Sequence, residues 1–563
     1  MVRKALALVM SATIVMSGCN SALTSFPPPT TTTVTPTTSA QVIKHVVVIF
    51  DENISFDHYF GTYPNAANLS TDSTKFTALS TTPTNISNYA TSPALLTSNP
   101  NLNAANGAGA TNPFRLSAEQ AGTGDQDHNY GPEQSAFDSS KMDLFPFSVG
   151  TPDGSALTAA TGGSAITDTT GLTMGYYDGN TVTALWNYAQ HYALNDHSFG
   201  STFGASTQGA INLVSGQTNG VANYTSGATS GVIADGQGGY TLIGDEDPTG
   251  DVCSSSASVQ MNAAGGKNIN IGDLLNNAGV TWGFFEGGFN LSITNPASGT
   301  TPSSTGCNRT TNAVNIPGNP PKADYIPHHE PFQYYASTAN PQHLRPTSTA
   351  AIGTTDQANH QYDTIDFTTA LGAGNLPAVS FLKAPGFQDG HAGYSDPLDE
   401  QTWLVNTINA IEKSSFWPST AIIIAYDDSD GWYDHVTDIV NGSATTADSL
   451  NGTGLCLSST TLSGPNSNGK PVQGRCGHGP RLPLLVISPW AQKNYIDNTP
   501  TDQASITRFI EDTFLAGQRL PTGSFDATAG TLNAMFNFTN GAVIPNPNVV
   551  QLNATTGAVT SGN

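Results

Sequence analysis

The decisive stretch is His45-Val46-Val47-Val48-Ile49-Phe50-Asp51-Glu52-Asn53, in which an apolar, mostly β-branched run ends in two acids and an amide. A continuous apolar run without polar alternation is typical of a strand that is buried on both faces of a parallel sheet. Three further runs of this kind follow, namely AVSFL at 378–382, AIIIA at 421–425 and LLVI at 484–487. The sequence therefore predicts four buried strands, the first of them at 45–50.

Two helical patterns interleave with these strands. Apolar residues recur at three- and four-residue spacing in 402–411 and again in 506–515. Strands that alternate with helices predict an α/β fold with a mainly parallel central sheet flanked by helices. The intervals 62–125, 216–275 and 436–474 are rich in Gly, Ser, Thr and Asn, and we expect them to form loop-rich cap insertions.

The composition is that of a folded, acidic protein. Hydrophobic residues make up 37% of the 563 residues, which suffices for a sizeable core and argues against wholesale disorder. Asp and Glu number 42 against 18 Lys and Arg, so the formal net charge is −24. A chain this acidic repels a polyanion, so we do not expect a nucleic-acid partner.

The N-terminus has the features of an export signal. Arg3 and Lys4 precede an apolar run at 5–16, which is too short to span a bilayer as a permanent helix. The small residues before Cys19 resemble a bacterial lipoprotein cleavage site. We therefore expect residues 1–18 to be a signal peptide and Cys19 to carry a lipid that anchors the protein in the bacterial cell envelope. Plain secretion without lipidation is the alternative.

The segment after Cys19 is a candidate tether. Residues 19–41 hold eight Thr and four Pro, a composition that cannot bury a core and favours an extended chain. We expect the folded domain to span residues 42–540. A loose tail is expected at 541–563.

The remaining cysteines suggest disulfides. If Cys19 carries lipid, four are left: Cys253, Cys307, Cys456 and Cys476. An even number in an exported chain predicts two disulfides. Proximity in the sequence favours Cys253–Cys307 and Cys456–Cys476, which is one of three connectivities. No CxxC pattern is present, so a zinc-thiolate site is not expected.

Two of the predicted strands end in acid. Glu52 and Asn53 follow the first, and Asp427 and Asp428 follow the third. In open parallel sheets, ligands bind beyond the carboxyl ends of the strands. Carboxylates gathered there repel one another unless a cation lies between them, and their hard oxygen atoms suit one divalent metal ion. The alternative is ordinary turn chemistry, because Asp and Asn are common at strand ends.

Several of the twelve histidines lie in polar, turn-rich contexts, among them His128, His329, His391 and His435. A neutral imidazole can bind metal, and a protonated one can hold an anion or protonate a leaving group. The alternative for each of them is a structural or solvent-exposed role.

A candidate nucleophile lies in residues 203–213, which read FGASTQGAINL. Gly204 permits a tight turn, and a helix can start near Thr207, where a hydroxyl is favoured as an N-cap. Free backbone N–H groups and the helix dipole also favour negative charge at such a start. A hydroxyl there is therefore well placed to attack an anionic substrate.

Together these motifs closely resemble the bacterial phosphoesterase family, which contains phosphatidylcholine-type phospholipases C and the acid phosphatase A group within the alkaline-phosphatase-like superfamily. Residues 45–61 (HVVVIFDENISFDHYFG) are similar to its opening motif, with Ile54 in place of the common Arg. The similarity spans residues 42–540 in the family's order. It continues through Asp127-His128, Lys141-Met142-Asp143, 204–217, 329–334, 391–397, 426–435, 479–483 and 487–489.

The resemblance implies a role for each matched residue. It implies one divalent metal ion, of unknown identity, with four oxygen ligands: Glu52, Asn53, Asp427 and Asp428. It implies phosphate-binding or proton-donating roles for three histidines: His128, His329 and His391. Ser206 is implied as the nucleophile that becomes transiently phosphorylated. Gln208 stands where the wider superfamily has Pro, so Thr207 remains an alternative to Ser206.

We therefore expect an exported, metal-dependent hydrolase of phosphate esters. The Asp427-Asp428 pair and the segment 204–207 resemble the acid phosphatase branch, which predicts phosphate monoesters as substrates. A phospholipase C that cleaves phosphodiester head groups is the alternative. A lipid-anchored binding protein that has lost the chemistry is a more remote alternative.

Overall fold

The computed structural model describes residues 38–150, 170–262, 268–294, 305–314, 316, 322–438, 440, 448, 462–464, 470–521, 523–538 and 548–562. The expected signal peptide, Cys19, nearly all of the expected tether and Cys456 lie outside these described residues.

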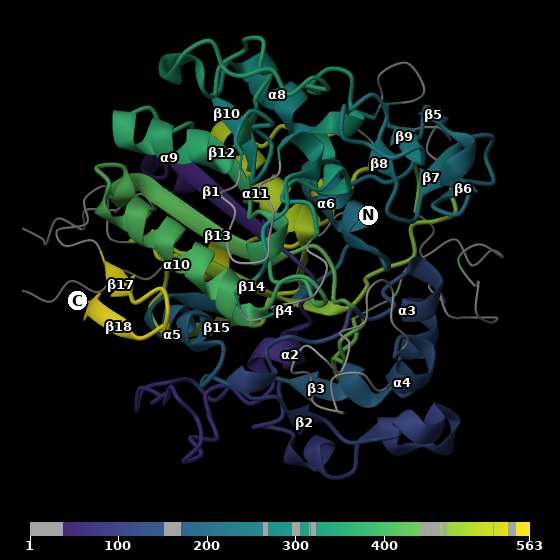
Figure 1. The fold of residues 1–563 in the computed structure, drawn as a ribbon, viewed down its shortest axis with the longest axis vertical. Coiled ribbons are helices and arrows are strands. Elements are labelled where there is room, and N and C mark those ends of the chain that lie inside the picture. The colour runs from purple at the N-terminus through teal and green to yellow at the C-terminus, as the bar shows by residue number, and fades with distance from the viewer. Residues whose placement is uncertain are drawn as a thin grey trace, which may run out of the picture. The chain divides into compact units, whose positions relative to one another are not determined.

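The centre of the fold is a sheet of nine strands within the described ranges (Figure 1). Its strand order is β11-β10-β12-β1-β13-β14-β4-β15, and β16 pairs with β4 as well. The strands have these bounds: β1 His45–Asp51, β4 Ala193–Phe199, β10 Trp282–Glu286, β11 Gln361–Asp363, β12 Val379–Lys383, β13 Thr420–Tyr426, β14 Arg481–Ile487, β15 Tyr495–Asp497 and β16 Thr501–Asp502.

The sheet is mainly parallel, as the apolar runs predict. β1 pairs in parallel with β12 on one side and with β13 on the other, and β10 pairs in parallel with β11 and β12. Among the described strands of this sheet, only β14 runs antiparallel to its neighbours, β13 and β4. The four predicted strands are β1, β12, β13 and β14. The prediction of an α/β fold with a mainly parallel sheet is confirmed.

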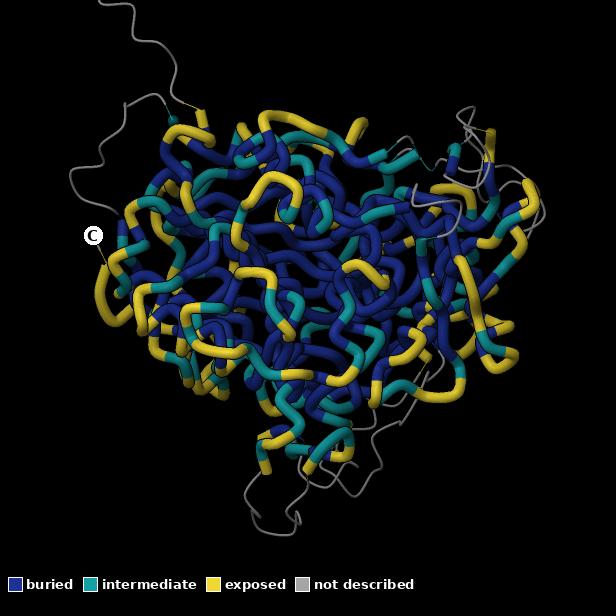
Figure 2. Tube along the Cα trace, turned by 90° about the horizontal axis from the view of Figure 1, so that it is seen from above, coloured by how far each residue is buried: buried dark blue, intermediate teal, exposed yellow. Residues whose placement is uncertain are grey.

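β1 and β13 lie in the interior of the protein. All residues of β13 are buried, as are all residues of β1 except the half-buried His45, and Figure 2 shows this buried interior surrounded by exposed loops. Such burial matches the absence of polar alternation in both runs. The central strands therefore form a well-packed support whose carboxyl ends carry the acidic residues.

Helices pack on the sheet and connect its strands. Their bounds are α1 Ser39–Val42, α2 Phe56–Phe60, α3 Tyr130–Phe137, α4 Phe145–Ser148, α5 Thr183–His191, α6 Ser206–Ser215, α8 Ile271–Ala278, α9 Thr364–Ala373, α10 Pro397–Lys413 and α11 Gln503–Phe514. The predicted helices at 402–411 and 506–515 correspond to α10 and α11. α6 packs against α11, and Figure 1 shows α9 and α10 in front of the strands and α11 behind them. Within the described ranges, no helix has both the length and the apolar character needed to cross a bilayer.

The expected cap insertions carry short strands in their described parts. Residues 216–275 contribute two small sheets, which lie together at one side of Figure 1. Their strands are β5 Asn223–Tyr224, β6 Val232–Ala234, β7 Tyr240–Leu242, β8 Asp247–Pro248 and β9 Ser258–Gln260. β2 (Phe114–Arg115) pairs with β3 (Gly175–Tyr176) in a further small sheet. Most of 439–469 lies outside the described residues.

The C-terminal residues differ from the loose tail that the sequence suggests. β17 (Val550–Leu552) and β18 (Val559–Gly562) form an antiparallel hairpin. Asn409 of α10 donates to the Leu552 carbonyl at 2.8 Å and accepts the Leu552 backbone N–H at 3.1 Å. The expectation is therefore wrong for residues 548–562, because polar side chains of α10 and buried Val550 and Leu552 dock this segment on the domain.

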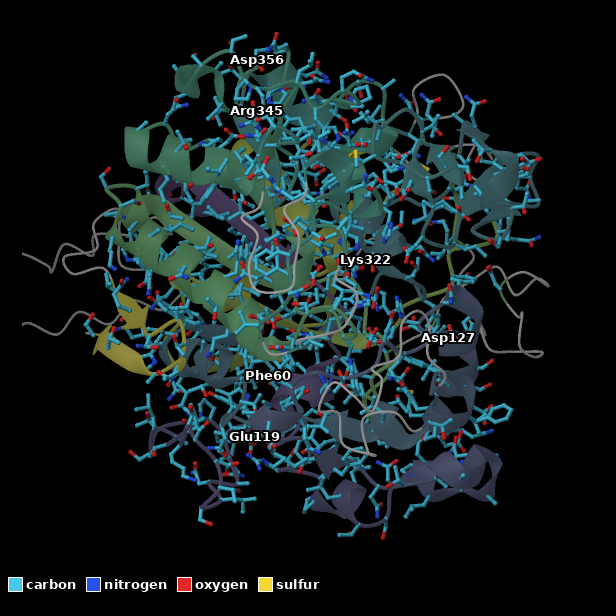
Figure 3. The ribbon with its side chains drawn as sticks, in the orientation of Figure 1. Phe60, Glu119, Asp127, Lys322, Arg345 and Asp356 are labelled. Carbon is cyan, nitrogen blue, oxygen red and sulfur yellow. A yellow bond between two sulfur atoms is a disulfide. The ribbon has the colours of Figure 1, made fainter. Side chains whose placement is uncertain are left out.

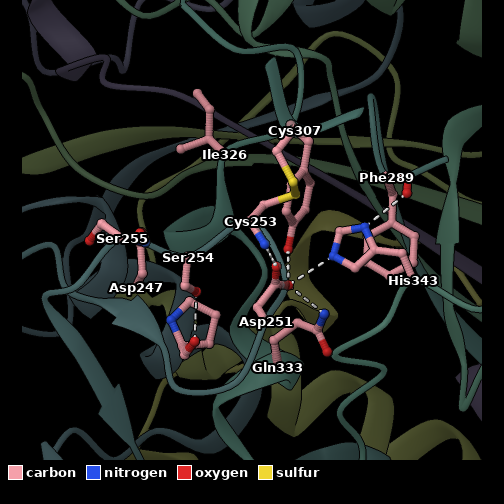
Figure 4. The surroundings of a disulfide bond; sticks show 12 residues. Asp247, Asp251, Cys253, Ser254, Ser255, Phe289, Cys307, Ile326, Gln333 and His343 are labelled. Atoms are coloured by element: carbon pink, nitrogen blue, oxygen red, sulfur yellow. Dashed lines mark hydrogen bonds and ion pairs between the residues drawn. A yellow bond between two sulfur atoms is a disulfide. The ribbon is translucent and has the colours of Figure 1, made fainter. Parts of the chain in front are cut away.

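One expected disulfide lies within the described residues. Cys253 and Cys307 are bonded, with their Cα atoms 5.3 Å apart. Beside the bond, Asp251 accepts hydrogen bonds from Gln333 at 2.7 Å and from His343 at 2.9 Å, as Figure 4 shows. The Cys253–Cys307 pairing is confirmed. Cys476 is also disulfide-bonded, and its expected partner Cys456 lies outside the described residues.

Candidate functional site

The candidate site lies beyond the carboxyl ends of β1 and β13. Glu52 and Asn53 directly follow β1, Asp427 and Asp428 directly follow β13, and the two strands pair in register to their last residues. All four side chains are buried. Asn53 has a left-handed backbone conformation (φ 55°), which Asn tolerates better than most residues. The structure therefore brings the two predicted acidic clusters together.

Glycines let the start of α6 approach these strand ends. Ser206 is the first residue of α6, and Gly204 before it has φ 112°, a conformation that side chains disfavour. Gly209 packs directly on the end of β13, since a Cβ atom there would lie 2.2 Å from the Asp427 carbonyl oxygen. This close contact brings the serine to the acidic residues.

The Ser206 hydroxyl faces three of the predicted ligands. Ser206 Oγ lies 3.1 Å from Glu52 Oε2, 3.1 Å from Asp428 Oδ2 and 3.4 Å from Asn53 Oδ1. A hydroxyl has one proton, so it can donate to only one of these acceptors at a time. The Ser206 hydroxyl therefore contacts the acidic residues, as the sequence predicts. The role of Ser206 as a nucleophile stays a prediction.

The neighbouring hydroxyl points elsewhere. Thr207 Oγ1 donates to Asp245 Oδ1 at 2.8 Å, and the Thr207 backbone N–H donates to the same oxygen at 2.9 Å. This engagement of Thr207 favours Ser206 as the reactive hydroxyl.

The crowded oxygen atoms fit a cation. Asn53 Oδ1 lies 2.6 Å from Glu52 Oε2 and 3.1 Å from Asp427 Oδ1. An amide oxygen brings no proton to a carboxylate, so these contacts repel unless the amide turns over or a cation lies among the oxygens. Carboxylate and amide oxygens are the ligands that hard divalent ions prefer. The donor set therefore suits a divalent metal ion.

Lys383 is a buried cation at this site that the sequence analysis missed. It is the last residue of β12, and only 2% of it is exposed. Its Nζ contacts Glu52 Oε1 and lies 3.3 Å from Asp427 Oδ2. The sequence does contain a signal for Lys383, because it follows the apolar run at 378–382 and a lysine that ends a buried run needs carboxylate partners.

The three predicted histidines lie around Asn53 and Glu52. His128 Nε2 and His391 Nε2 lie 3.4 Å and 2.9 Å from Asn53 Nδ2, and His329 Nδ1 lies 3.3 Å from Glu52 Oε1. The Nδ1 atoms of His128 and His391 donate to backbone carbonyls at 2.7 and 2.6 Å. These bonds orient both Nε2 atoms toward Asn53.

The histidines have different electrostatic surroundings. Burial lowers the pKa of His128. Nearby carboxylates, among which Asp428 has the largest effect, together raise the pKa of His128 well above its usual value. Burial, followed by the positive charge of Lys383, holds the pKa of His329 well below that value. Burial and the charge of His128 lower the pKa of His391 in the same way. His128 is therefore the histidine most favoured to carry a proton.

Glu133 of α3 joins the loop before Ser206 (the serine loop, which contains Gly204) to the loop after β13 (the acidic loop, which contains Ser429). Its Oε2 accepts the backbone N–H of Gly204 and its Oε1 accepts the Ser429 hydroxyl, both at 2.8 Å. Burial raises the pKa of Glu133 to about 7, although both hydrogen bonds oppose that rise. No sequence pattern indicated this link, because the partners lie 71 and 296 residues away.

His435 lies in a separate network. Its Nδ1 is 2.6 Å from Asp57 Oδ2, and Arg481 forms ion pairs of 3.0 Å with both Asp57 and Asp434. These buried groups satisfy one another. His435 therefore supports the structure beside the site and does not contact the acidic residues that follow β1 and β13.

A lysine adds positive charge beside the histidines. Lys322, labelled in Figure 3, is exposed, and its Nζ lies 5.5 Å from the centre of the Tyr394 ring. The Tyr394 ring in turn stacks on His391 at 4.3 Å. An anion that approaches this side of the site meets a positive charge on a strongly acidic protein.

Residues 43–515 match the model of the Phosphoesterase family, which is most of the chain. The chain belongs to the phosphoesterase family.

Named relatives are similar to this chain over part of its length. It is 30% identical over 177 residues to the non-hemolytic phospholipase C of Pseudomonas aeruginosa, an alignment that covers 30% of this chain and 24% of the relative. It is 26% identical over 184 residues to phospholipase C A of Mycobacterium tuberculosis, with 33% and 34% covered. The aligned part is thus about a third of these relatives or less.

A solved structure also aligns with this chain. Murine ectonucleotide pyrophosphatase/phosphodiesterase 5 aligns with 63% of this chain and 95% of its own, at 11% identity and a TM-score of 0.27. This similarity is too low to bear on the function.

Proposed function

We propose that this phosphoesterase hydrolyses phosphate esters through a phosphorylated Ser206 with the help of one divalent metal ion. The observation that carries the proposal is the position of Ser206 Oγ, which lies within 3.4 Å of oxygen atoms of Glu52, Asn53 and Asp428. The Ser206 hydroxyl is held next to the side chains that would bind the metal ion, so it needs little reorganisation before it attacks phosphorus.

The metal-binding part of the proposal rests on four side chains. The ion would be held by side-chain oxygen atoms that lie next to Ser206 Oγ or to one another, and these belong to Glu52, Asn53, Asp427 and Asp428. When bound, a divalent ion lowers the pKa of a nearby hydroxyl and neutralises charge on phosphate oxygens. The neutral amide of Asn53 keeps the ligand set less negative than four carboxylates would, which helps an anionic ester to approach.

The chain's own residues would carry out the two steps of hydrolysis. The Ser206 hydroxyl would give its proton to the carboxylate of Glu52 or Asp428, each 3.1 Å away. The bond from Ser206 Oγ to phosphorus then forms as the ester bond breaks, and His128 donates a proton to the leaving oxygen. Water then attacks the phosphoserine while His128, now neutral, accepts a proton from that water. The bond from phosphorus to Ser206 Oγ breaks, phosphate leaves, and Ser206 takes its proton back from the carboxyl group that held it.

The negative charge of a bound ester favours the protonated forms of His329 and His391, which would then donate to the phosphate oxygens. The positive end of the α6 helix dipole also favours that negative charge.

Two substrate classes are supported by different observations. The names of the relatives from Pseudomonas and Mycobacterium favour phosphodiester head groups of phospholipids. The Asp427-Asp428 pair and the segment 204–207 resemble the acid phosphatase branch, which favours phosphate monoesters. Both reactions use the same serine and ligands, so the substrate class depends on contacts with the leaving group.

The location of the protein is a separate part of the proposal. Residues 1–18 would direct export, Cys19 would carry the lipid anchor, and residues 19–41 would tether the catalytic domain to the cell envelope. This placement suits an enzyme whose substrates are extracellular esters or phospholipid head groups. Mass spectrometry of the N-terminal peptide from the native host would reveal a lipidated Cys19, or an unmodified cysteine if the protein is only secreted.

A substrate panel tests the proposed reaction. The purified chain is stripped with a chelator, and half is restored with Mn²⁺ or Zn²⁺. Phosphate release from p-nitrophenyl phosphate supports a monoesterase, and phosphocholine release from phosphatidylcholine vesicles supports a phospholipase C. We expect activity on at least one substrate, lost with the chelator and regained with metal. Absence of hydrolysis on the whole panel would instead support a binding protein.

A further inference from the structure

Burial fixes Lys383 at the base of the site. It ends β12, which pairs directly with β1, and its Nζ contacts Glu52 Oε1 and lies 3.3 Å from Asp427 Oδ2. Only 2% of the residue is exposed. A buried ammonium needs such partners, so the lysine and the two carboxylates hold one another in place.

The same two carboxylates turn their other oxygens inward. Glu52 Oε2 lies 3.1 Å from Ser206 Oγ, and Asp427 Oδ1 lies 3.1 Å from Asn53 Oδ1. Each carboxylate therefore has an outer oxygen held by Lys383 and an inner oxygen that faces the metal-binding centre. In Asp427 that inner oxygen also accepts the backbone N–H groups of Asn53 at 3.2 Å and of Asp428 at 2.9 Å.

Asp428 divides its two oxygens in a similar way. Its Oδ1 accepts the backbone N–H of Asp430 at 2.7 Å, and its Oδ2 lies 3.1 Å from Ser206 Oγ. All three carboxylates can thus offer a metal ion one oxygen each. With the amide oxygen of Asn53, the protein supplies four monodentate ligands.

We propose that Lys383 makes this a site for a small divalent ion and discriminates against calcium. The inference rests on the proposed metal-dependent function. Calcium binds about six to eight oxygens and often takes both oxygens of a carboxylate, whereas zinc and magnesium accept fewer or monodentate ligands. Lys383 occupies the second oxygens of Glu52 and Asp427, which calcium would use.

Removing the ammonium tests the proposal by metal binding alone. Lys383→Met keeps the apolar stem of the side chain, and Lys141→Met makes the same charge change at a side chain that is 63% exposed. Each protein is stripped of metal and titrated calorimetrically with MnCl₂ and with CaCl₂. We expect the wild type to bind Mn²⁺ about 100-fold more tightly than Ca²⁺. Lys383→Met should reduce that ratio by about tenfold or more, and Lys141→Met should preserve it.

Several outcomes would overturn the inference. One is an unchanged ratio in Lys383→Met. Another is a wild-type chain that binds Ca²⁺ as tightly as Mn²⁺, a result that needs no variant and decides the matter even if Lys383→Met fails to fold. The proposed function fails by a different measurement, namely the absence of phosphoester hydrolysis. Binding of neither ion by the wild type would reject both proposals.

Discussion

Ser206 has one hydroxyl proton and three oxygen neighbours, so at the scale of the residue its replacement is the most direct test of the chemistry. Ser206→Ala removes the nucleophile and leaves the surrounding oxygens in place. We expect turnover to fall by at least about 10³-fold, as for other nucleophile deletions, while the protein still unfolds cooperatively. Thr207→Val is the matched control and should keep most of its turnover, because Thr207 Oγ1 is engaged by Asp245. Equal losses in both variants would contradict the assignment.

Glu133 offers a second test at this scale. Glu133→Ala leaves the buried Gly204 N–H and Ser429 hydroxyl without their acceptor, and we expect kcat to fall by about 10- to 100-fold through misplacement of the serine loop. Glu133→Gln keeps an oxygen for Gly204 and can donate to Ser429, so it should recover most of that loss. Steady-state kinetics on the best substrate of the panel measure both. Equal kcat values for the two variants would exclude this positioning role.

The residues at strand ends were the most predictable part of the site. Glu52 and Asp427 could be placed together because adjacent parallel strands bring their carboxyl ends to one edge of the sheet. Ser206 could be proposed only through its helix start and the family resemblance. Glu133 could not be found, since a hydrogen bond between segments so distant in sequence leaves no periodic signal. The ligand and catalytic roles themselves stay predictions.

At the scale of the element, the site depends on the close packing of α6 against the end of β13. A Cβ atom on Gly209 would lie 2.2 Å from the Asp427 carbonyl oxygen, so Gly209→Ala must push the helix away. We expect a loss of about 1–3 kcal/mol in the free energy of unfolding, together with lower kcat. Gly372→Ala in α9 is the matched control, because its Cβ would meet open space, and it should stabilise by about 0.5–1 kcal/mol. Urea unfolding of both variants checks this, and a stable, fully active Gly209→Ala would contradict it.

The elements that the sequence did not reveal have an identifiable cause. β4 contains Asn195 and Asp196 within a buried strand, so it lacks the apolar run that marks β1 and β13. Their polar atoms are satisfied by residues distant in sequence, since Asn195 donates to Asp497 of β15 at 3.1 Å and Asp196 accepts the backbone N–H of Ser87 at 2.7 Å. Tertiary hydrogen bonds of this kind offset the free-energy cost of burying polar groups, and no local sequence pattern predicts them.

At the scale of the whole molecule, the C-terminal hairpin is held by the same domain that contains the central sheet. The C-terminal hairpin docks on α10 at Asn409, and Trp417 donates to the Asn548 carbonyl at 2.8 Å. The hairpin was not predictable from composition, because its short strands resemble the loose Gly- and Thr-rich segments elsewhere. Its docking centres on Glu412, which accepts hydrogen bonds from Tyr192 at 2.5 Å and from Gln551 at 2.8 Å.

Glu412 should make the docking of this hairpin depend on pH. Burial raises the pKa of Glu412 from 4.5 to about 7, although its hydrogen bonds oppose the rise. The folded state then binds more protons than the unfolded state between these pH values, so the free energy of unfolding falls as pH rises from about 4.5 to about 7. A pKa difference of about 2.5, at about 1.4 kcal/mol for each pKa unit, corresponds to a loss of about 3 kcal/mol.

Glu412→Gln isolates this contribution from that of other buried acids. The neutral amide can still accept from Tyr192, and Gln551 can turn its unpartnered Oε1 toward the new NH₂ group. We expect the variant to match the wild type near pH 4.5 and to exceed its free energy of unfolding by up to about 3 kcal/mol above pH 7. Glu119→Gln, at an exposed glutamate, should follow the wild-type curve throughout. Parallel curves for the wild type and Glu412→Gln from pH 4.5 to 8 would show that this carboxyl does not control the docking of the hairpin.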